Sequence, residues 1–186
     1  MVNNLNNRLK SGRVIATLSL STALIAVGAF IKIPLPMDMY ITMQVFFVIL
    51  SGFLVGRLSS VAALAYMCIG LIGLPVFAAG GGFSYIFKPS FGYILAFIPA
   101  GYLTGLLTKK QNCSFLRYFL SGIAGVIVIY IIGIIYLILI VTLYSGNTVT
   151  SKYIFITLFL STIWKDILVT LLAAYVAKKI RRLVRP

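Results

Sequence analysis

The sequence predicts an all-α integral membrane protein with six transmembrane helices and both termini in the cytoplasm. Of the 186 residues, 61% are hydrophobic and only 10% are charged, whereas soluble domains carry about 25% charged residues. The apolar residues fall in long continuous runs and give a mean hydropathy of +1.10, as expected for membrane-spanning helices. The chain shows no internal repeat or linker, so we expect a single six-helix membrane domain over residues 1–186.

Six apolar runs are predicted to cross the bilayer, which takes about 20 helical residues per span. They are Val14–Ile33, Ile41–Gly56, Leu58–Phe77, Phe91–Leu107, Phe115–Tyr144 and Tyr153–Ala177. The first run follows three cations, as the core of a signal peptide would, but it is longer than the roughly 7–15 residues of such a core. The second run is short for a span, and the fifth is long enough to tilt.

The distribution of cations orients these spans, because cytoplasmic loops carry an excess of Lys and Arg. Twelve cations fall on the side of the N-terminus: Arg8, Lys10, Arg13, Arg57, Lys109, Lys110, Arg117, Lys178, Lys179, Arg181, Arg182 and Arg185. Lys32, Lys88 and Lys152 fall on the other side, and Lys165 lies within the last span. We therefore expect a cytoplasmic N-terminus over residues 1–13, an extracytoplasmic loop over residues 75–91 and a basic cytoplasmic tail over residues 178–186.

Composition excludes several classes of function. The chain has two acids, Asp38 and Asp166, and no histidine, which disfavours a catalytic triad, a histidine metal site and acid–base catalysis. Cys68 and Cys113 lie far apart in the sequence, so we expect unpaired thiols. Since the net charge of +14 is arranged around the apolar runs, we expect a lipid bilayer as partner, no nucleic acid, no metal and no cofactor.

Small residues at four-residue spacing predict close helix packing, because they let helix backbones approach each other. The pairs are Gly52/Gly56, Gly101/Gly105 and Ser121/Gly125. Packing within the bundle would use these pairs; the alternative is a docking surface for another membrane protein.

Charged residues inside the last predicted span indicate a candidate site, because a charge at that depth costs at least about 2.5–3.5 kcal/mol. Thr162, Asp166 and Thr170 recur at every fourth residue and form one polar stripe, flanked by Trp164. Lys165 is adjacent to Asp166, but successive residues on a helix point about 100° apart. We therefore expect the two not to face each other well and each to meet another group, which for at least one of them is a ligand. The alternative is a structural ion pair or an interhelical contact.

The loop PVFAAGGGFSYIFKPSFGY, residues 75–93, combines three consecutive glycines with six aromatic residues and one lysine. Glycine lets backbone groups approach a bound molecule, and aromatic rings form apolar pocket walls. Gln44 is predicted on the same outer side, where its amide can donate and accept hydrogen bonds. The predicted ligand contacts are Gln44, Phe77, Gly80, Gly81, Gly82, Tyr85, Lys88, Tyr93, Trp164, Lys165 and Asp166. The alternatives are an interhelical hydrogen bond at Gln44 and an interfacial aromatic belt in the loop.

The sequence contains no GxxxxGK[ST] phosphate-binding loop, so ATP hydrolysis is not expected in this chain. An uptake protein of this kind would capture its ligand while another subunit supplies the energy. Two other classes stay open: a membrane-embedded enzyme acting on a lipid or isoprenoid, and a structural scaffold.

The segment IPLPMDMYITMQVFFVILSGFLVGRLSSVAALAYMCIGLIGLPVFAAGGGFSYIFKPSFGYILAF, residues 33–97, resembles the BioY family, the biotin-specific S components of energy-coupling factor transporters. The similarity resumes around Asp166 and Ala173–Ala174. It implies an S-component-like bundle in a prokaryotic cell membrane that captures biotin from outside. The implied partners are a transmembrane T component and two ATPase subunits.

The resemblance implies roles for the predicted contacts, with biotin as the transported ligand. Asp166 and Gln44 suit the ureido ring, the aromatic residues suit the bicyclic body, and Lys165 or Lys88 suits the carboxylate. Family members often carry a lysine three residues after the aspartate, where this chain has Val169. Lys165 lies one helical turn from that position, so we expect it to keep the cation on the same face. The A-x-x-x-A contact motif expected in the first helix is only approximated, by Ser19/Ala23 and Thr22/Ala26.

Overall fold

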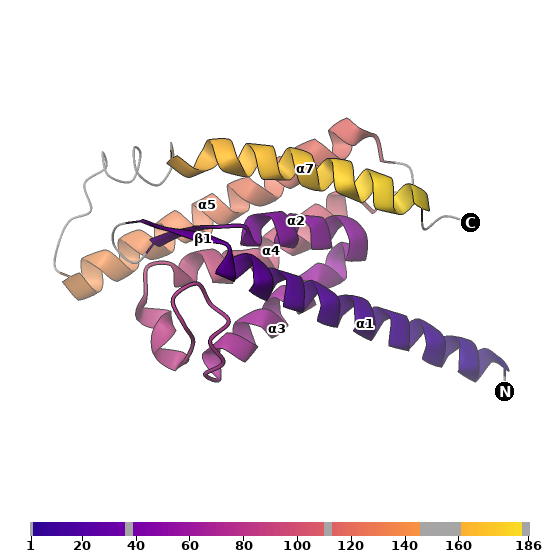
Figure 1. Cartoon of the computed structure of the whole chain (residues 1–186), viewed down its shortest axis with the longest axis horizontal. Coiled ribbons are helices and arrows are strands. Elements are labelled where there is room, and N and C mark those ends of the chain that lie inside the picture. Colours follow the sequence, from indigo (N-terminus) through magenta and orange to yellow (C-terminus); the bar gives the residue numbers. More distant parts are fainter. Residues whose placement is uncertain (1, 36–38, 110–112, 146–160, 184–186) are drawn as a thin grey trace.

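The computed structural model describes residues 2–35, 39–109, 113–145 and 161–183, and this part of the chain is mostly helical (Figure 1). The α-helices are α1 (Val2–Phe30), α2 (Gln44–Val55), α3 (Ser59–Leu71), α4 (Phe91–Leu107), α5 (Phe115–Ser145) and α7 (Ser161–Leu183). Two 3-10 helices, η1 (Gly56–Leu58) and η2 (Phe83–Phe87), and two strands, β1 (Lys32–Leu35) and β2 (Met39–Thr42), complete the elements.

Helices α2 and α4 form the centre of the bundle. Helix α2 packs against α1, α4 and α7, and α4 packs against α2, α3 and α5. Helices α5 and α7 also pack against each other, and α1 extends beyond the other helices at its N-terminal end (Figure 1). The central position of α2 explains its buried face, where Ile49 and Phe53 are fully buried.

Close packing between α2, α4 and α5 depends on small residues, as the four-residue spacing predicts. A Cβ atom on Gly52 would lie 2.9 Å from Thr104 Cβ, and one on Gly125 would lie 2.5 Å from Thr104 Oγ1. A Cβ atom on Gly105 would lie 2.2 Å from the backbone carbon of Gly56. These glycines therefore serve packing within the bundle. Gly56 also has a φ of +72°, a conformation that favours glycine, and there the chain turns from α2 into α3.

A β-hairpin corrects the all-α expectation. Strands β1 and β2 pair antiparallel, with Ile33 opposite Ile41 and Pro34 opposite Tyr40. Pro34 lacks an N–H group and disfavours helix interior, while Tyr40 and Ile41 favour extended backbone. The predicted second span, Ile41–Gly56, is therefore strand at its start, and its helix begins only at Gln44.

The other predicted span limits differ from the helices to varying degrees. Helix α4 matches its predicted span. Helix α5 is one residue longer than the fifth predicted span. Helix α3 ends at Leu71, six residues before the predicted Phe77, because Gly73 with a φ of +111° starts the loop. Residues 178–183 of the predicted tail continue α7, and residues 153–160 of the sixth predicted span lie outside the described residues.

Three helical stretches of the described residues are long and apolar enough to cross a membrane. They are Gly12–Phe30, Gln44–Leu71 and Phe115–Leu143. The second comprises α2, η1 and α3, and Phe91–Leu107 is apolar but shorter.

Candidate ligand-binding site

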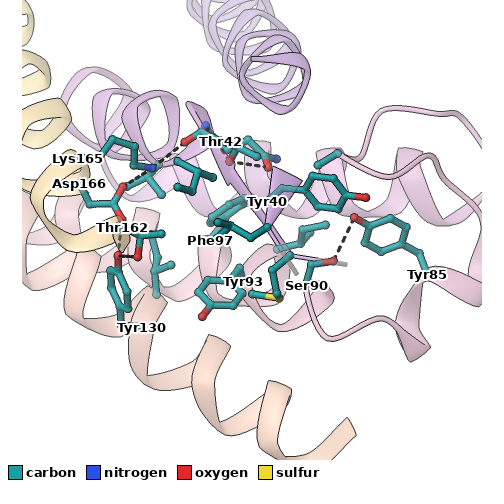
Figure 2. Close-up of a pocket in the computed structure, with 18 residues that line it drawn as sticks. Tyr40, Thr42, Tyr85, Ser90, Tyr93, Phe97, Tyr130, Thr162, Lys165 and Asp166 are labelled. Carbon is teal, nitrogen blue, oxygen red and sulfur yellow. Dashed lines mark hydrogen bonds and ion pairs between the residues drawn. The ribbon is translucent and has the colours of Figure 1, made fainter. Parts of the chain in front are cut away.

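A cavity lies between the hairpin, the loop after α3 and helices α2, α4, α5 and α7 (Figure 2). The space between its lining atoms, together with the open solvent at its mouth, amounts to about 680 Å³. Its walls are Leu35, Met39, Tyr40, Ile41, Thr42, Gln44, Val45, Ala78, Tyr85, Ser90, Tyr93, Ile94, Phe97, Ile129, Tyr130, Thr162, Lys165 and Asp166. Apolar and aromatic side chains with a few fixed polar groups are typical of a small-molecule site.

A buried ion pair lies at one end of the cavity. Lys165 Nζ is 2.6 Å from Asp166 Oδ1, and it also donates a hydrogen bond to the backbone carbonyl of Thr42 at 2.8 Å. Asp166 is 3% exposed. Its Oδ1 atom accepts no hydrogen bond of acceptable geometry from the described residues, although the ammonium group is close. The charge of that buried oxygen is therefore compensated by the Lys165 ammonium group.

The expectation that Lys165 and Asp166 do not face each other is wrong. Their Cα–Cβ bonds diverge on the helix, but the four methylene groups of lysine are long enough to bring Nζ back to the carboxylate. Each residue also meets partners on other elements, as expected. Tyr130 donates to Asp166 Oδ2 at 2.7 Å and lies 2.6 Å from Thr162 Oγ1.

The polar stripe on α7 is confirmed as one face of the helix. Thr162 and Asp166 line the cavity, and the fully buried Thr170 donates from its hydroxyl to the backbone carbonyl of Asp166 at 2.6 Å. The stripe therefore continues from the cavity into the packed interior.

Gln44 lies at the first turn of α2 and is 4% exposed. Its Nε2 donates to the Tyr66 hydroxyl at 2.7 Å, and its Oε1 accepts from the Thr42 hydroxyl at 3.2 Å. Tyr66 in turn donates to the backbone carbonyl of Val76 at 3.0 Å. Because Thr42 also accepts from Lys165 through its backbone, one continuous network joins α7, β2, α2, α3 and the loop.

The opposite end of the cavity is formed by the loop and the start of α4. Ser90 donates to the Tyr85 hydroxyl at 3.3 Å, and Tyr40, Tyr93 and Phe97 lie between this end and the ion pair (Figure 2). Burial is the main cause that raises the pKa of Tyr85 above its usual value, so its hydroxyl stays protonated at neutral pH. The cavity is thus polar at both ends and aromatic in between.

Two lysines lie next to residues of this loop end. Lys88 Nζ is 5.6 Å from the centroid of the Tyr85 ring. Lys32 Nζ is 5.4 Å from the centroid of the Tyr40 ring and donates to the backbone carbonyl of Ala78. Both distances allow cation–π attraction.

The structure brings together five of the eleven predicted contacts on the cavity wall: Gln44, Tyr85, Tyr93, Lys165 and Asp166. The other six do not line it. Trp164 is 60% exposed, because it lies beside the stripe on the outer side of α7. Lys88 is not part of the wall, and its Nζ lies 5.6 Å from the centroid of the Tyr85 ring.

Phe77 and the three consecutive glycines pack the loop against α3 instead of lining the cavity. Phe77 is 1% exposed, and a Cβ atom on Gly70 would lie 2.0 Å from its ring. The Gly82 amide donates to the Gly70 carbonyl at 2.7 Å, and a Cβ atom on Gly81 would lie 2.1 Å from the Leu74 carbonyl oxygen. The close backbone approach that the glycines permit is therefore to the protein itself.

Sequence reasoning did not select several cavity residues, above all Tyr130, Thr42 and Tyr40. Tyr130 is a hydroxyl-bearing residue within a run of Ile and Val, and this isolated polar group is the signal that could have identified it. Thr42 and Tyr40 belong to strand β2, which begins before the predicted span of residues 41–56 and continues into it. Phe97 carries no signal that separates it from the other aromatic residues of its helix.

Comparisons with known proteins give a consistent result. The family model described as "BioY family" matches residues 3–186. A "Probable biotin transporter BioY" of Lysinibacillus sphaericus is 34% identical over 90% of this chain and 86% of its own length. A "Biotin transporter BioY" of Thermotoga maritima is 38% identical over 87% of this chain and 92% of its own length.

The fold is also similar to that of a solved structure, the S-component for biotin from an ECF-type ABC transporter. The TM-score is 0.77 over 93% of each chain, at 22% sequence identity.

Proposed function

Because the chain belongs to the BioY family, we propose that it is a biotin-binding S component of an energy-coupling factor transporter. It captures biotin from outside the cell and is not an enzyme. The single observation that carries the ligand assignment is the carboxylate of Asp166, which is paired with Lys165 in the wall of an aromatic cavity and whose Oδ1 accepts no hydrogen bond of acceptable geometry from the described residues.

The polar groups of biotin match those of the cavity. The ureido ring offers two N–H donors and one carbonyl acceptor, so it fits an end that presents carboxylate and ammonium groups side by side. Asp166 accepts an N–H, and Lys165 donates to the ureido carbonyl. The apolar bicyclic body lies along Tyr93 and Phe97, where flat rings give contact area.

The carboxylate of biotin then lies at the loop end of the cavity. Lys165 is 2.6 Å from Asp166 and belongs to the ureido end, so it does not also serve the far end of an extended ligand. Lys88, beside Tyr85, is the cation that we assign to the carboxylate. The Tyr85 and Ser90 hydroxyls supply neutral hydrogen-bonding groups nearby.

We assign six spans to the chain, with both termini cytoplasmic, on the basis of twelve cations on one side and three on the other. The loop end of the cavity then faces outward, where biotin arrives. A T component and two ATPase subunits supply the energy, and no cofactor is needed.

To test the orientation, single cysteines at positions 88 and 109 are introduced into a variant lacking Cys68 and Cys113. A membrane-impermeant thiol reagent applied to intact cells should label position 88 alone; labelling of position 109 alone would invert the topology.

Binding is tested with the detergent-purified chain and radiolabelled biotin, with thiamine and riboflavin as control ligands. Biotin should bind and raise the midpoint of thermal unfolding, and Asp166→Asn should weaken binding at least tenfold, because a charged acceptor contributes about 1.5–3 kcal/mol. Stabilisation by thiamine or riboflavin alone would keep the class of protein and change the ligand. No effect of any of the three would overturn the proposed function.

The assignment of Lys88 is tested with biotin and its neutral primary amide. Wild type should prefer biotin to the amide, and Lys88→Ala should reduce this preference. If Lys165→Ala reduced it instead, the ligand would lie in the opposite direction in the cavity.

A further inference from the structure

Tyr66 is a fully buried residue of α3 that does not line the cavity, yet its hydroxyl bonds directly to a residue that does. It accepts from Gln44 Nε2 at 2.7 Å and donates to the Val76 carbonyl at 3.0 Å. The proposed function does not use Tyr66. Its position between the cavity and the loop nevertheless determines what Gln44 can offer a ligand.

The orientation of the Gln44 amide follows from the hydrogen-bonding capacities of its neighbours. A phenol has one hydrogen to donate, and the carbonyl of Val76 can only accept it. The group of Gln44 that faces Tyr66 must therefore be a donor, which is the NH₂ group. The carbonyl oxygen Oε1 then lies on the other side, where it accepts from Thr42 at 3.2 Å and keeps a second lone pair.

We propose that Tyr66 is a positioning residue that fixes Gln44 as a hydrogen-bond acceptor and thereby makes the cavity selective for a ligand with two N–H donors. Asp166 provides one acceptor and Gln44 provides the second. A free glutamine amide could rotate and present its NH₂ group, which would repel an N–H of the ligand. This inference rests on the proposed function, because it assigns a partner to each ureido N–H of biotin.

The packing of the loop gives the Tyr66 interaction its fixed geometry. Val76 lies in the loop, whose position is held by the Phe77 amide bonded to the Gly80 carbonyl at 2.8 Å and by the contact of the Phe77 ring with Gly70. The Phe77 and Tyr66 rings also contact each other, with centroids 5.4 Å apart. The glycine-rich loop thus affects the ligand indirectly: it positions Tyr66, and Tyr66 orients Gln44.

The experiment measures the affinity of biotin and of its two singly N-methylated ureido derivatives. Each methyl group removes one N–H donor, so in the wild type both derivatives should bind at least tenfold more weakly than biotin, the loss expected for a buried acceptor left without a donor. In Tyr66→Phe, one of the two derivatives should bind only about threefold more weakly than biotin, or less. The loss of affinity for the other derivative, the N-methylation penalty at the other nitrogen, should be unchanged. In Asp166→Asn, the other derivative should show the reduced penalty.

A double-mutant cycle separates positioning from a structural effect of Tyr66. Gln44→Met removes the amide but keeps the side-chain length, and it should abolish the same N-methylation penalty as Tyr66→Phe. Combining the two substitutions should produce no further change in that penalty. Tyr102→Phe, at an exposed position of α4, is the matched tyrosine control and should behave as wild type.

The possible failures are distinguishable. If the wild type does not bind biotin, the proposed function fails and this inference with it. If biotin binds but both penalties persist in Tyr66→Phe, the inference alone is overturned, even where overall affinity falls. Should Tyr66→Phe not yield folded protein, Gln44→Met decides: unchanged penalties in that variant would overturn the assignment of Gln44 as the acceptor.

Discussion

Replacing Lys165 with alanine tests the ion pair at the end of the cavity that we assign to the ureido ring. The substitution removes the ammonium group 2.6 Å from Asp166 Oδ1 and leaves a carboxylate that is 3% exposed. Breaking a buried pair in this way typically costs about 3–5 kcal/mol. Because the Lys165 side chain is itself 16% exposed, we expect the lower end of that range, a loss of about 3 kcal/mol in the free energy of unfolding.

The double variant Lys165→Ala/Asp166→Asn distinguishes an uncompensated charge from lost packing. Replacing both partners of a buried pair is often nearly neutral, because no charge remains without a counter-ion. The double variant should therefore recover about 2 of the 3 kcal/mol, while biotin binding should stay lost in both variants, since the donor and the acceptor of the ureido ring are both needed. Lys179→Ala, at an exposed position of the same helix, is the control and should change stability by at most about 0.5 kcal/mol.

Unfolding is followed by denaturant titration of the detergent-purified protein, and binding is followed by retention of radiolabelled biotin. Wild-type stability in Lys165→Ala would refute the argument from burial. A double variant no more stable than Lys165→Ala would show that packing, and not the unpaired charge, causes the loss. Undiminished biotin binding in Lys165→Ala would refute its role at the ureido ring.

Three further predictions test the rest of the site. Gly70→Ala should destabilise the protein by about 1–3 kcal/mol and weaken biotin binding, because its Cβ would lie 2.0 Å from the Phe77 ring. The control Gly12→Ala, with no atom within 4 Å of the added carbon, should leave binding unchanged. Equal effects of the two substitutions would contradict the packing argument. Tyr130→Phe removes the donor to Asp166 Oδ2 and should lower the free energy of unfolding by about 1.5–3 kcal/mol in the same titration, unlike Tyr175→Phe at a position that is 59% exposed. Trp164→Phe should leave biotin affinity within about twofold of wild type, because Trp164 is 60% exposed and off the cavity wall; a loss of tenfold or more in equilibrium binding would place Trp164 in the site.

The sequence predicted the parts of the site that depend on local properties of the chain. A charge is costly in an apolar helix, so Lys165 and Asp166 stood out without any knowledge of their neighbours, and the four-residue period placed Thr162 and Thr170 on the face of Asp166. Gln44 stood out because a polar amide is also unusual within an apolar run. The limits of α4 and α5 were likewise predictable, because a long and mostly apolar run coincides with each helix.

The hairpin was less predictable, because Ile41 and Thr42 are compatible with either a strand or the start of an apolar helix. Pairing with Lys32–Leu35 decides for the strand, and such pairing is a non-local interaction. Tyr40 and Thr42 became visible as cavity residues only once that pairing was known.

The sequence itself also indicated family membership, through the motifs of residues 33–97 and the last helix.

The tertiary structure alone decided which polar groups meet. The length of the lysine side chain let Lys165 reach Asp166 despite their divergent directions, and the fold brought Tyr130 from α5 to the same carboxylate. The glycine-rich loop gives the clearest contrast: its composition indicated close backbone contact, but only the packing of Phe77 on Gly70 showed that the contact is with the protein. The composition of a segment determines how closely its backbone can approach other groups. Which groups lie next to it depends on the positions of elements that are distant in the sequence.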